Sequence, residues 1–348
     1  MSEITIAAVG DILINGMISL SAKLPNVGED VYDYDPIFRE IAPVLQQADL
    51  TIGNLETPLY GNEPFVKKRN PATGNPLFST PESLAPALKR AGFDVLTTAN
   101  NHCLDNGREG LLRTIEVLDE TGIAHTGTYA SAESARDLLI LERGGIRVGL
   151  LSYTKHTNRN PIPRDMPWCV NLLDVRRMLA DVKRLREQGA DIVIVSLHDG
   201  IEYSAVPTAR QKAMARKLLQ SGADIILGAH PHVLQPIVWT RNNKVKAYSL
   251  GNLISIRLKR NPYTHNGIVL LITVRKDEGG RAEIKQVDYQ STWVKRFRAD
   301  SAVQYRVIPN REVAYIHGAH ASGVSARDVR LMRIMRAHTK RMIRKYRM

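Results

Sequence analysis

The chain is poor in cysteine, in aromatic residues and in long apolar runs, and each shortage narrows what it can be. Only two of its 348 residues are cysteines, Cys103 and Cys169, so it can form at most one disulfide, and reduced thiols are the expected state. Aromatic residues make up 6% of the chain, which argues against a stacking platform for single-stranded nucleic acid. No run approaches the roughly 20 apolar residues that a membrane-spanning helix needs. The first residues, MSEITIAAVGD, contain Glu3 and no basic segment, so we expect no signal peptide and a cytoplasmic location.

Acidic residues are outnumbered by basic ones, and the formal net charge is +13. Much of the excess lies in residues 325–348, which hold Arg327, Arg330, Arg333, Arg336, Lys340, Arg341, Arg344, Lys345 and Arg347 against Asp328 alone. A basic chain favours an anionic partner, such as nucleic acid, an anionic membrane or an acidic polymer, although a solvated tail explains the charge equally well. Apolar and aromatic positions recur here at helical spacing, at Leu331, Met335, His338, Met342 and Tyr346. They predict a basic amphipathic helix that either lies on an anionic membrane surface or packs on the body of the protein.

Short apolar segments alternate with amphipathic ones along most of the chain, which is the pattern of an α/β protein. Most of the apolar runs are continuous, as in strands that are covered on both faces. We expect strands over 4–10, 50–56, 93–100, 147–153, 191–198, 224–230, 246–252 and 267–274, and helices over 81–92, 108–122, 173–190 and 207–223. Two segments rich in Pro and Asn, 60–80 and 154–168, are expected to be long loops with a functional role.

The α/β pattern weakens after Val274. We therefore divide the chain into a main domain over 1–275, an edge hairpin and extension of the same domain over 276–324, and a basic helical tail over 325–348. The segment AEIKQVDYQSTWVKRF, residues 282–297, is the expected source of the antiparallel hairpin.

Polar side chains stand where the expected strands end. They are Asp11 in VGD, Asn54 and Glu56 in GNLE, Asn100, Asn101, His102 and Asp105 in ANNHCLD, His198, Asp199, Glu202 and Tyr203 in HDGIEY, His230 and His232 in HPH, and Asn252 in SLGN. Because ligands of α/β sheets bind at the carboxyl ends of the strands, these groups are expected to converge on one crevice. Each group taken alone also has a structural explanation, such as a turn, a helix N-cap or a hydrogen-bonded histidine.

Carboxylates, amides and imidazoles without a matched set of cysteines suit one or two ions of Mn²⁺, Zn²⁺ or Fe²⁺. Two ions bridged by a carboxylate would polarise a phosphoryl or carbonyl oxygen, and a neighbouring histidine could protonate the leaving group. Cys103, beside His102, is expected to be a small buried residue rather than a nucleophile.

Seven motifs occur in order: VGD, GNLETPL, TTANNHCLDNGREG, LSYTKHTN, HDGIEY, GADIILGAHPHVLQPI and YSLGN. Together they resemble the CapA (PgsA-type) poly-γ-glutamate capsule-synthesis family, which is similar to the calcineurin-like metallophosphoesterases. The resemblance runs from Ile4 to Asn252 and extends toward Val274. It implies a four-layer α/β/β/α sandwich with the site at the strand ends.

The resemblance also assigns roles to residues. The implied metal ligands are Asp11, Glu56, Asn101, His198, His230 and His232, and the implied catalytic group is His102 with Asp105. The chain departs from the phosphoesterase pattern where Leu13 stands in place of a histidine, where Asn54 and Glu56 are the candidates for a bridging Asp, with Glu56 favoured, and where Ala229 is inserted after Gly228. It departs from the CapA-like pattern at Asp199 and at Lys155 or His156, which place polar or charged groups beside the crevice.

Three functions are compatible with these observations. We favour a metal-dependent hydrolase or transferase that acts on an anionic polymer, such as poly-γ-glutamate, or on a small anionic substrate. The expected substrate-binding residues are Asn54, Lys67, Lys68, Lys155, Glu202, Tyr203 and Asn252. The alternative is a non-catalytic accessory protein that binds an acidic polymer and a membrane-bound synthase or membrane surface. Nucleic-acid processing is the third, and the low aromatic content and the lack of a recognition motif argue against it.

Overall fold

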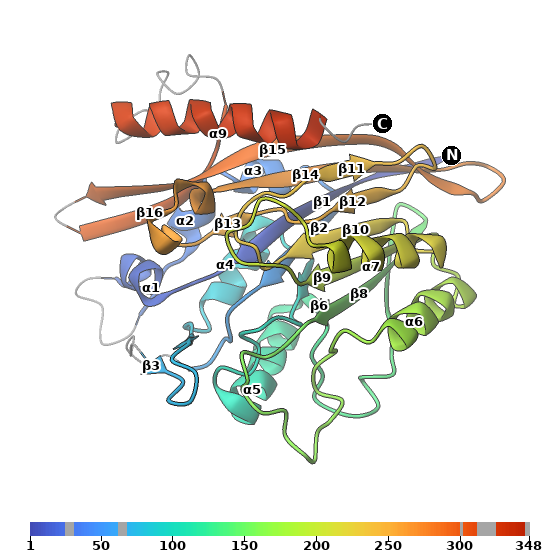
Figure 1. Ribbon diagram of the computed structural model, residues 1–348, viewed down its shortest axis with the longest axis horizontal. Helices are drawn as coiled ribbons and strands as arrows, with labels where there is room; N and C mark the ends of the chain where they lie inside the picture. Colours follow the sequence, from blue (N-terminus) through green and yellow to red (C-terminus); the bar gives the residue numbers. More distant parts are fainter. Residues whose placement is uncertain (25–30, 62–67, 300–301, 312–324, 345–348) are drawn as a thin grey trace.

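Two β-sheets pack face to face in the computed structural model, which describes residues 1–24, 31–61, 68–299, 302–311 and 325–344 (Figure 1). The large sheet has the strand order β16 (Ala302–Pro309), β15 (Ala282–Ala299), β14 (Asn266–Lys276), β1 (Ser2–Ile12), β2 (Leu50–Leu55), β5 (Val95–Thr97), β6 (Ala124–Thr126), and β13 (Asn252–Ile254) also pairs with β1. The small sheet has the order β11 (Ile237–Trp239), β12 (Val245–Ala247), β10 (Ile225–Ala229), β9 (Ile192–His198), β8 (Ile146–Thr154), β7 (Leu139–Arg143). A separate pair is formed by β3 (Lys68–Arg69) and β4 (Pro76–Leu77).

The core between the sheets is built from alternate residues of the continuous apolar runs. In β1, Ile4 and Ile6 belong to the inter-sheet core, whereas Val9 belongs to the cluster on the other face. In β9, Ile194 faces the large sheet and Val193 faces the helices. Burying both faces stabilises the fold by about 1.5–3 kcal/mol for each such side chain, and it explains why these strands lack polar alternation.

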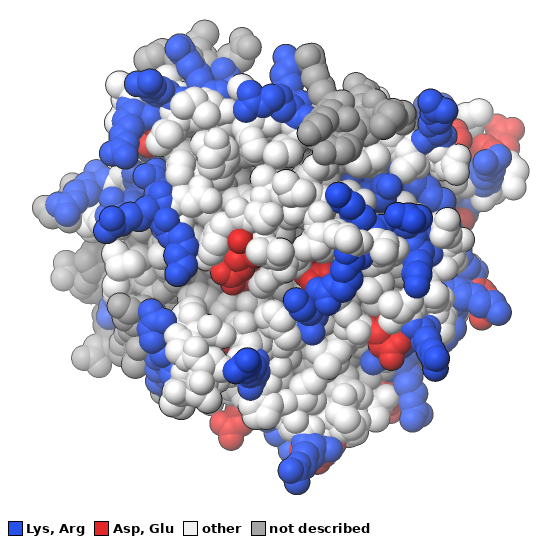
Figure 2. Space-filling view, in the orientation of Figure 1, with Lys and Arg blue, Asp and Glu red and all other residues white. Residues whose placement is uncertain are grey.

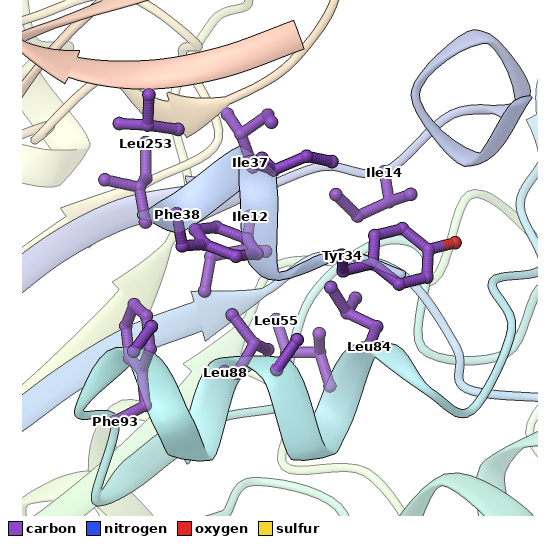
Figure 3. Close-up of a cluster of buried hydrophobic side chains, with 14 of the residues drawn as sticks. Ile12, Ile14, Tyr34, Ile37, Phe38, Leu55, Leu84, Leu88, Phe93 and Leu253 are labelled. Atoms are coloured by element: carbon purple, nitrogen blue, oxygen red, sulfur yellow. The ribbon is translucent and has the colours of Figure 1, made fainter. Parts of the chain in front are cut away.

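Helices cover the outer face of each sheet and complete the four-layer α/β/β/α sandwich that the resemblance implies. On the large sheet lie α1 (Gly16–Ala22), α2 (Asp35–Phe38), α3 (Ala42–Leu45), α4 (Leu84–Ala91) and α5 (Gly107–Thr121). On the small sheet lie α6 (Val175–Glu187) and α7 (Ala209–Gln220). Figure 3 shows one outer core, where Ile12 and Leu55 at the strand ends meet Phe38 of α2 and Leu88 of α4.

The long helices begin and end at the residues that the sequence marks. The Asp174 side chain caps α6 by accepting hydrogen bonds from two backbone amides, and Thr208 forms a capping box with Gln211 at the start of α7. Helices α4 and α5 end at Gly92 and Gly122, which adopt the left-handed conformation that glycine tolerates best.

The expected strand 246–252 is wrong as a single element, because the chain leaves one sheet and enters the other within it. β12 pairs with β10 of the small sheet, whereas β13 pairs with β1 of the large sheet. Gly251 has a positive φ of 67°, and its carbonyl accepts a hydrogen bond of 3.0 Å from the Asp11 amide. This crossing brings the polar end of β10 next to the polar end of β1.

The segment 282–297, from which an antiparallel edge hairpin is expected, lies in the 18-residue strand β15, which pairs antiparallel with β14 on one side and with the edge strand β16 on the other, so the antiparallel edge pair consists of β15 and β16. The basic segment after 325 forms α9 (Ala326–Arg344), which lies along β15 and beside β11 (Figure 1). Met332 and Met335 are buried against Trp293 and Ile308. The structure therefore shows the helix packed on the body, and Tyr346 lies outside the described residues.

Two short 3₁₀ helices, η1 (Leu258–Arg260) and η2 (Pro262–His265), connect β13 to β14. Among the described residues, no helix has both the length and the apolar character required to cross a membrane.

Candidate metal centre

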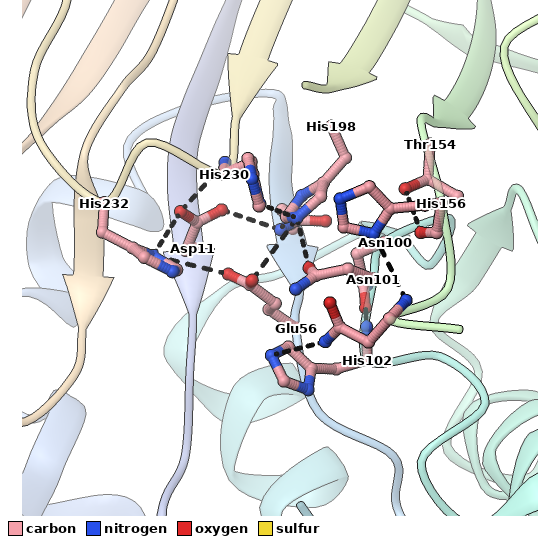
Figure 4. A network of polar contacts seen from close by, with 12 residues as sticks. Asp11, Glu56, Asn100, Asn101, His102, Thr154, His156, His198, His230 and His232 are labelled. Carbon is pink, nitrogen blue, oxygen red and sulfur yellow. Dashed lines mark hydrogen bonds and ion pairs between the residues drawn. The ribbon is translucent and has the colours of Figure 1, made fainter. Parts of the chain in front are cut away.

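The polar strand ends meet between the two sheets, as Figure 4 shows. Asp11, Glu56 and Asn101 come from the ends of β1, β2 and β5 in the large sheet, and His198 and His230 come from the ends of β9 and β10 in the small sheet. All of these side chains are buried, so the site lies in the interior of the sandwich rather than on its surface.

Glu56 stands at the centre of the site. One group of possible metal ligands is Glu56, His198 and His230, and a second is Asp11, Glu56 and His232, with ligand atoms within 4.8 Å of one another in each. Glu56 Oε1 lies 3.4 Å from His198 Nε2, and Oε2 lies 3.8 Å from His232 Nδ1. Neither carboxylate oxygen has a hydrogen-bond partner, although the side chain is fully buried. A cation bound in either group would supply the partner that these oxygens lack, because Glu56 belongs to both groups.

Asp11 is held by neighbours on both sides. The Asn54 amide donates a hydrogen bond of 2.8 Å to Asp11 Oδ1, and His232 Nδ1 lies 3.1 Å from Asp11 Oδ2. His232 Nδ1 is also 3.0 Å from Asn252 Oδ1, while the Asn252 amide donates to Ser255 Oγ and to the Thr264 carbonyl. Asn54 and Asn252, which were expected to bind substrate, are thus buried and in contact with ligand side chains.

The second group is tied together through His198. Its Nε2 is 2.6 Å from Asn101 Oδ1 and 3.2 Å from His230 Nδ1. His230 and His232 have positive φ values of 97° and 57°, and non-glycine residues adopt this conformation only at a cost. The His230 amide donates to Asp11 Oδ2 at 3.3 Å, so the strained turn aims backbone and side chain into the same site.

Burial sets the electrostatics of the centre. Desolvation, reinforced by the nearby Asp11 carboxylate, raises the pKa of Glu56 well above its ordinary value. Desolvation lowers the pKa of His198 and of His230 well below the ordinary value, so both imidazoles are neutral and able to donate a lone pair. Burial alone lowers the pKa of His232, but its contact with the Asp11 carboxylate outweighs burial and the net pKa is raised.

His102 and Asp105 form a pair beside the centre, which we call the acid dyad. His102 Nδ1 lies 2.6 Å from Asp105 Oδ2. The other contacts of Asp105 come from outside the dyad: the Phe78 amide donates to Oδ2 at 2.8 Å and the Asn160 amide donates to Oδ1 at 3.0 Å. Asp105 is therefore fixed on both oxygens and orients the imidazole, which leaves His102 Nε2 for other partners.

The 154–168 segment reaches over the acid dyad, and of its residues the sequence singled out only Lys155 and His156. Asn158 Nδ2 lies 3.5 Å from His102 Nε2, and the ring of His156 is 5.7 Å from that of His230. Asn160 also accepts a hydrogen bond of 2.8 Å from Asn70, which joins this segment to the β3–β4 hairpin. For Asn158 and Asn160 the only signal in the sequence was the length and composition of the loop, which indicated a role without indicating these residues.

The charged residues expected to contact substrate lie farther out. Lys68 on β3 and Lys155 after β8 are exposed, and the Lys155 amide donates to the His198 carbonyl at 3.1 Å. Glu202 is exposed, and the half-buried Tyr203 has its ring 6.1 Å from that of His232. Lys67 lies outside the described residues.

Two further expectations concern Asp199 and Cys103. Asp199 is buried and forms an ion pair with Arg210, so its charge is compensated beside the site. Cys103 and Cys169 are both free and buried, and burial raises the pKa of the Cys103 thiol, which suits a structural residue rather than a nucleophile.

A two-sheet sandwich with a carboxylate- and histidine-rich centre at the strand ends defines a protein of the metallophosphoesterase fold. Two solved structures share the fold over 97% of this chain. A protein described as a 5'-nucleotidase from Staphylococcus aureus, in complex with alpha-ketoglutarate, has a TM-score of 0.52 at 15% identity over 58% of its own chain. The Haemophilus influenzae NAD nucleotidase has a TM-score of 0.52 at 12% identity over 68% of its own chain. Identities this low show the fold alone.

The chain belongs to the family described as bacterial capsule synthesis protein PGA_cap, whose model matches residues 5–257. The capsule biosynthesis protein CapA of Bacillus anthracis is 31% identical over 255 residues, which are 72% of this chain and 60% of that protein. The PGA biosynthesis protein CapA of Bacillus subtilis is 28% identical over 275 residues, 79% of this chain and 70% of that protein. A Mycobacterium tuberculosis protein, described as a polyglutamine synthesis accessory protein, is 27% identical over 217 residues, 59% of this chain and 55% of that protein. The chain therefore spans only part of the length of each of these relatives.

Proposed function

We propose that this protein is a divalent-metal-dependent hydrolase or transferase that acts on an anionic substrate during synthesis or processing of a capsule polymer such as poly-γ-glutamate. The observation that carries the proposal is Glu56, whose two unpartnered oxygens face two groups of ligands beside the acid dyad. The names of the Bacillus relatives support the polymer class.

The donor set fits a divalent cation such as Mn²⁺, Zn²⁺ or Fe²⁺. Asp11, Glu56 and His232 would hold one ion, and Glu56, His198 and His230 would hold another, with Asn101 Oδ1 beside His198. Oxygen and imidazole nitrogen without thiolate suit these metals. Without a cation, two carboxylates share a buried space and the Glu56 oxygens stay unpaired, which is the arrangement that metal binding relieves.

The residues around the centre define the rest of the mechanism. Metal ions of this kind polarise a phosphoryl or carbonyl oxygen and lower the pKa of a bound water. His102, which Asp105 orients through Nδ1, would present Nε2 to the leaving group and act as its proton donor. The exposed Lys155, whose amide donates to the His198 carbonyl, and the exposed Lys68 on the β3–β4 hairpin would attract the anionic substrate, and ion pairs of Lys with carboxylate or phosphate are charge-assisted.

Metal content is the first test. Protein purified without chelator is analysed by inductively coupled plasma mass spectrometry, alongside His230→Ala/His232→Ala and the control His125→Ala, a histidine on β6 outside the centre. We expect one or two equivalents in wild type and in the control, and loss in the double variant. Absence of metal from wild type, even after loading with excess Mn²⁺ or Zn²⁺, would refute the proposal.

The catalytic role of the acid dyad is tested separately. His102→Ala should lower turnover of phosphoester or γ-glutamyl substrates by about 10²–10⁴-fold, because it removes the proton donor. Its metal content and melting temperature should stay close to wild type, since His102 belongs to neither ligand group. Full activity in this variant would remove His102 from the mechanism.

A non-catalytic accessory role is the second candidate. It is favoured by the M. tuberculosis relative, which is described as an accessory protein, and by the basic surface of this chain. In this case the protein would bind the acidic polymer, a membrane-associated synthase or an anionic membrane surface, and would show no turnover with metal loaded.

A further inference from the structure

The most basic element of the described structure is α9. Five of its residues, the basic stripe, are exposed cations: Arg327, Arg330, Arg333, Lys340 and Arg341. Figure 2 shows blue side chains along the upper edge of the molecule, where Figure 1 places α9. At 1.5 Å per residue, the stripe runs for about 21 Å from its first to its last cation.

The stripe is a fixed surface because the opposite side of the helix is anchored. Met335 is 1% exposed in a cluster with Trp293, and the Asn266 amide donates to Thr339 Oγ1 at 3.2 Å. Residues three and four apart lie on one side of a helix. Because Met335 and Thr339 face the body of the protein, the opposite side of α9, which carries the cations, faces solvent.

Within the described part of the chain, the charges of the stripe are not neutralised by acidic partners. Elsewhere, arginines such as Arg113 and Arg186 are paired with carboxylates. None of the five stripe cations has an ion pair with another described residue, and the sole acidic residue of α9, Asp328, instead bonds to Ser325 at the start of the helix. The stripe is therefore a linear cationic surface available to an external anion.

A second basic element connects the stripe to the metal centre. Asn252, which contacts His232, donates to the Thr264 carbonyl, and the adjacent Tyr263 packs its ring 4.9 Å from that of His338 on α9. In the same connection, Lys259 and Arg260 of η1 are exposed. Basic side chains thus lie on α9 and on the β13–β14 connection, whose Tyr263 contacts α9 and whose Thr264 contacts Asn252.

We propose that the basic stripe binds a linear polymer of carboxylates. Arginine binds carboxylates through two parallel hydrogen bonds, which suits an extended polyacid. The proposal rests on the proposed function, because it takes the polymer as the source of the anionic substrate.

Two other polyanions fit the surface less well. An anionic membrane binds amphipathic helices through their apolar side, which here is packed on the body, and Ile334 alone is a large apolar residue exposed on the described part of α9. Single-stranded nucleic acid binds through stacked aromatics, and the exposed large hydrophobic residues of the described structure include no aromatic.

The test is binding of fluorescently labelled poly-γ-glutamic acid to the full chain, followed by fluorescence anisotropy over a series of NaCl concentrations. The stripe variant is Arg330→Glu/Arg333→Glu/Lys340→Glu. The matched control, Arg176→Glu/Lys212→Glu/Arg216→Glu, makes the same change in net charge on exposed cations of α6 and α7. Circular dichroism melting confirms that both variants fold.

Wild type and the control should bind the polymer with salt-dependent affinity, and the stripe variant should bind at least roughly tenfold more weakly. Equal weakening in both variants would overturn the proposal in favour of net charge. Absence of wild-type binding would also overturn it, as would a stripe-dependent affinity that is higher for phosphatidylserine vesicles or for DNA than for the polymer. The stripe variant should keep the metal content of wild type, measured by inductively coupled plasma mass spectrometry, because its residues belong to neither ligand group, so a failure of metal binding is distinguishable from a failure of the stripe.

Discussion

Replacing Glu56 by glutamine should change stability in opposite directions with and without metal. Glutamine keeps the shape of the side chain and removes its charge. In the metal-free protein the Glu56 carboxylate is fully buried without a hydrogen-bond partner and lies near Asp11. Glutamine still places polar atoms at this position, so Glu56→Gln removes the cost of burying the charge, and it should stabilise the metal-free protein by about 1–3 kcal/mol at pH values where the Glu56 carboxyl is ionised.

The pH dependence of the stabilisation follows from the raised pKa of Glu56, which burial causes. A carboxyl group whose pKa is raised by folding is protonated and well accommodated in the folded state below its unfolded pKa. This contribution to stability is lost as the pH rises through the folded pKa, because the group must then ionise in the buried site. The advantage of Glu56→Gln should therefore be small in mild acid and should grow as the pH rises.

With metal, the order should reverse. A cation at 100 times its dissociation constant stabilises the folded protein by about 2.7 kcal/mol, and Glu56→Gln should lose this because both ligand groups share the removed carboxylate. The assay is urea unfolding of both proteins at several pH values, after chelation and after addition of Mn²⁺ or Zn²⁺. The matched control is Glu283→Gln, which makes the same substitution on β15 at a partly exposed side chain outside both ligand groups. A metal-free Glu56→Gln protein less stable than wild type at every pH would refute the view of Glu56 as an unpaired acid that awaits a cation.

Three further outcomes follow from the same structure. Asn160→Ala removes an amide that orients the acid dyad, and should lower kcat by about 10-fold or more with little change in KM or metal content, measured by steady-state kinetics. Burial lowers the pKa of His265 to about 3, so the folded protein loses stability as the pH falls below the ordinary pKa near 6.5. Between pH 7.5 and pH 5 this loss amounts to about 2 kcal/mol, and His265→Gln should remove it from the free energy of unfolding measured in urea. Met335→Ala, on the buried side of α9, should lower the free energy of unfolding by about 2–4 kcal/mol in the same assay. Ile334→Ala, at a side chain of the same helix that is 43% exposed, should lower it by less than about 0.5 kcal/mol.

The sequence predicted the elements whose patterns are long and continuous. The runs at 4–10, 191–198 and 224–230 appear as β1, β9 and β10, because strands buried on both faces need unbroken apolar residues. The four long helices before residue 225 also appear, because each has an apolar stripe and a capping residue at one end.

Elements set by tertiary context escaped prediction. The strands β6 and β11 have three residues each, too few to show a period. The change of sheets within 246–252 also has no local signal, because an apolar run looks the same whether one sheet or two receive it. The same limit applies to Asn158 and Asn160, since the contact of a loop side chain with the acid dyad depends on how the loop folds back.

The departures from the phosphoesterase pattern become consistent once their positions are known. The bridging Asp expected in the second motif is absent, yet Glu56 follows the end of β2, where its amide donates to the Ile12 carbonyl at 3.1 Å and its carboxylate belongs to both ligand groups. Asn54, on the strand itself, then acts as a donor to Asp11 rather than as a ligand. Leu13 is buried away from either group, and His232 completes the group that contains Asp11. The carboxylate that both possible ligand groups share is thus Glu56, which is why Glu56 is where a charge-removing substitution should matter most.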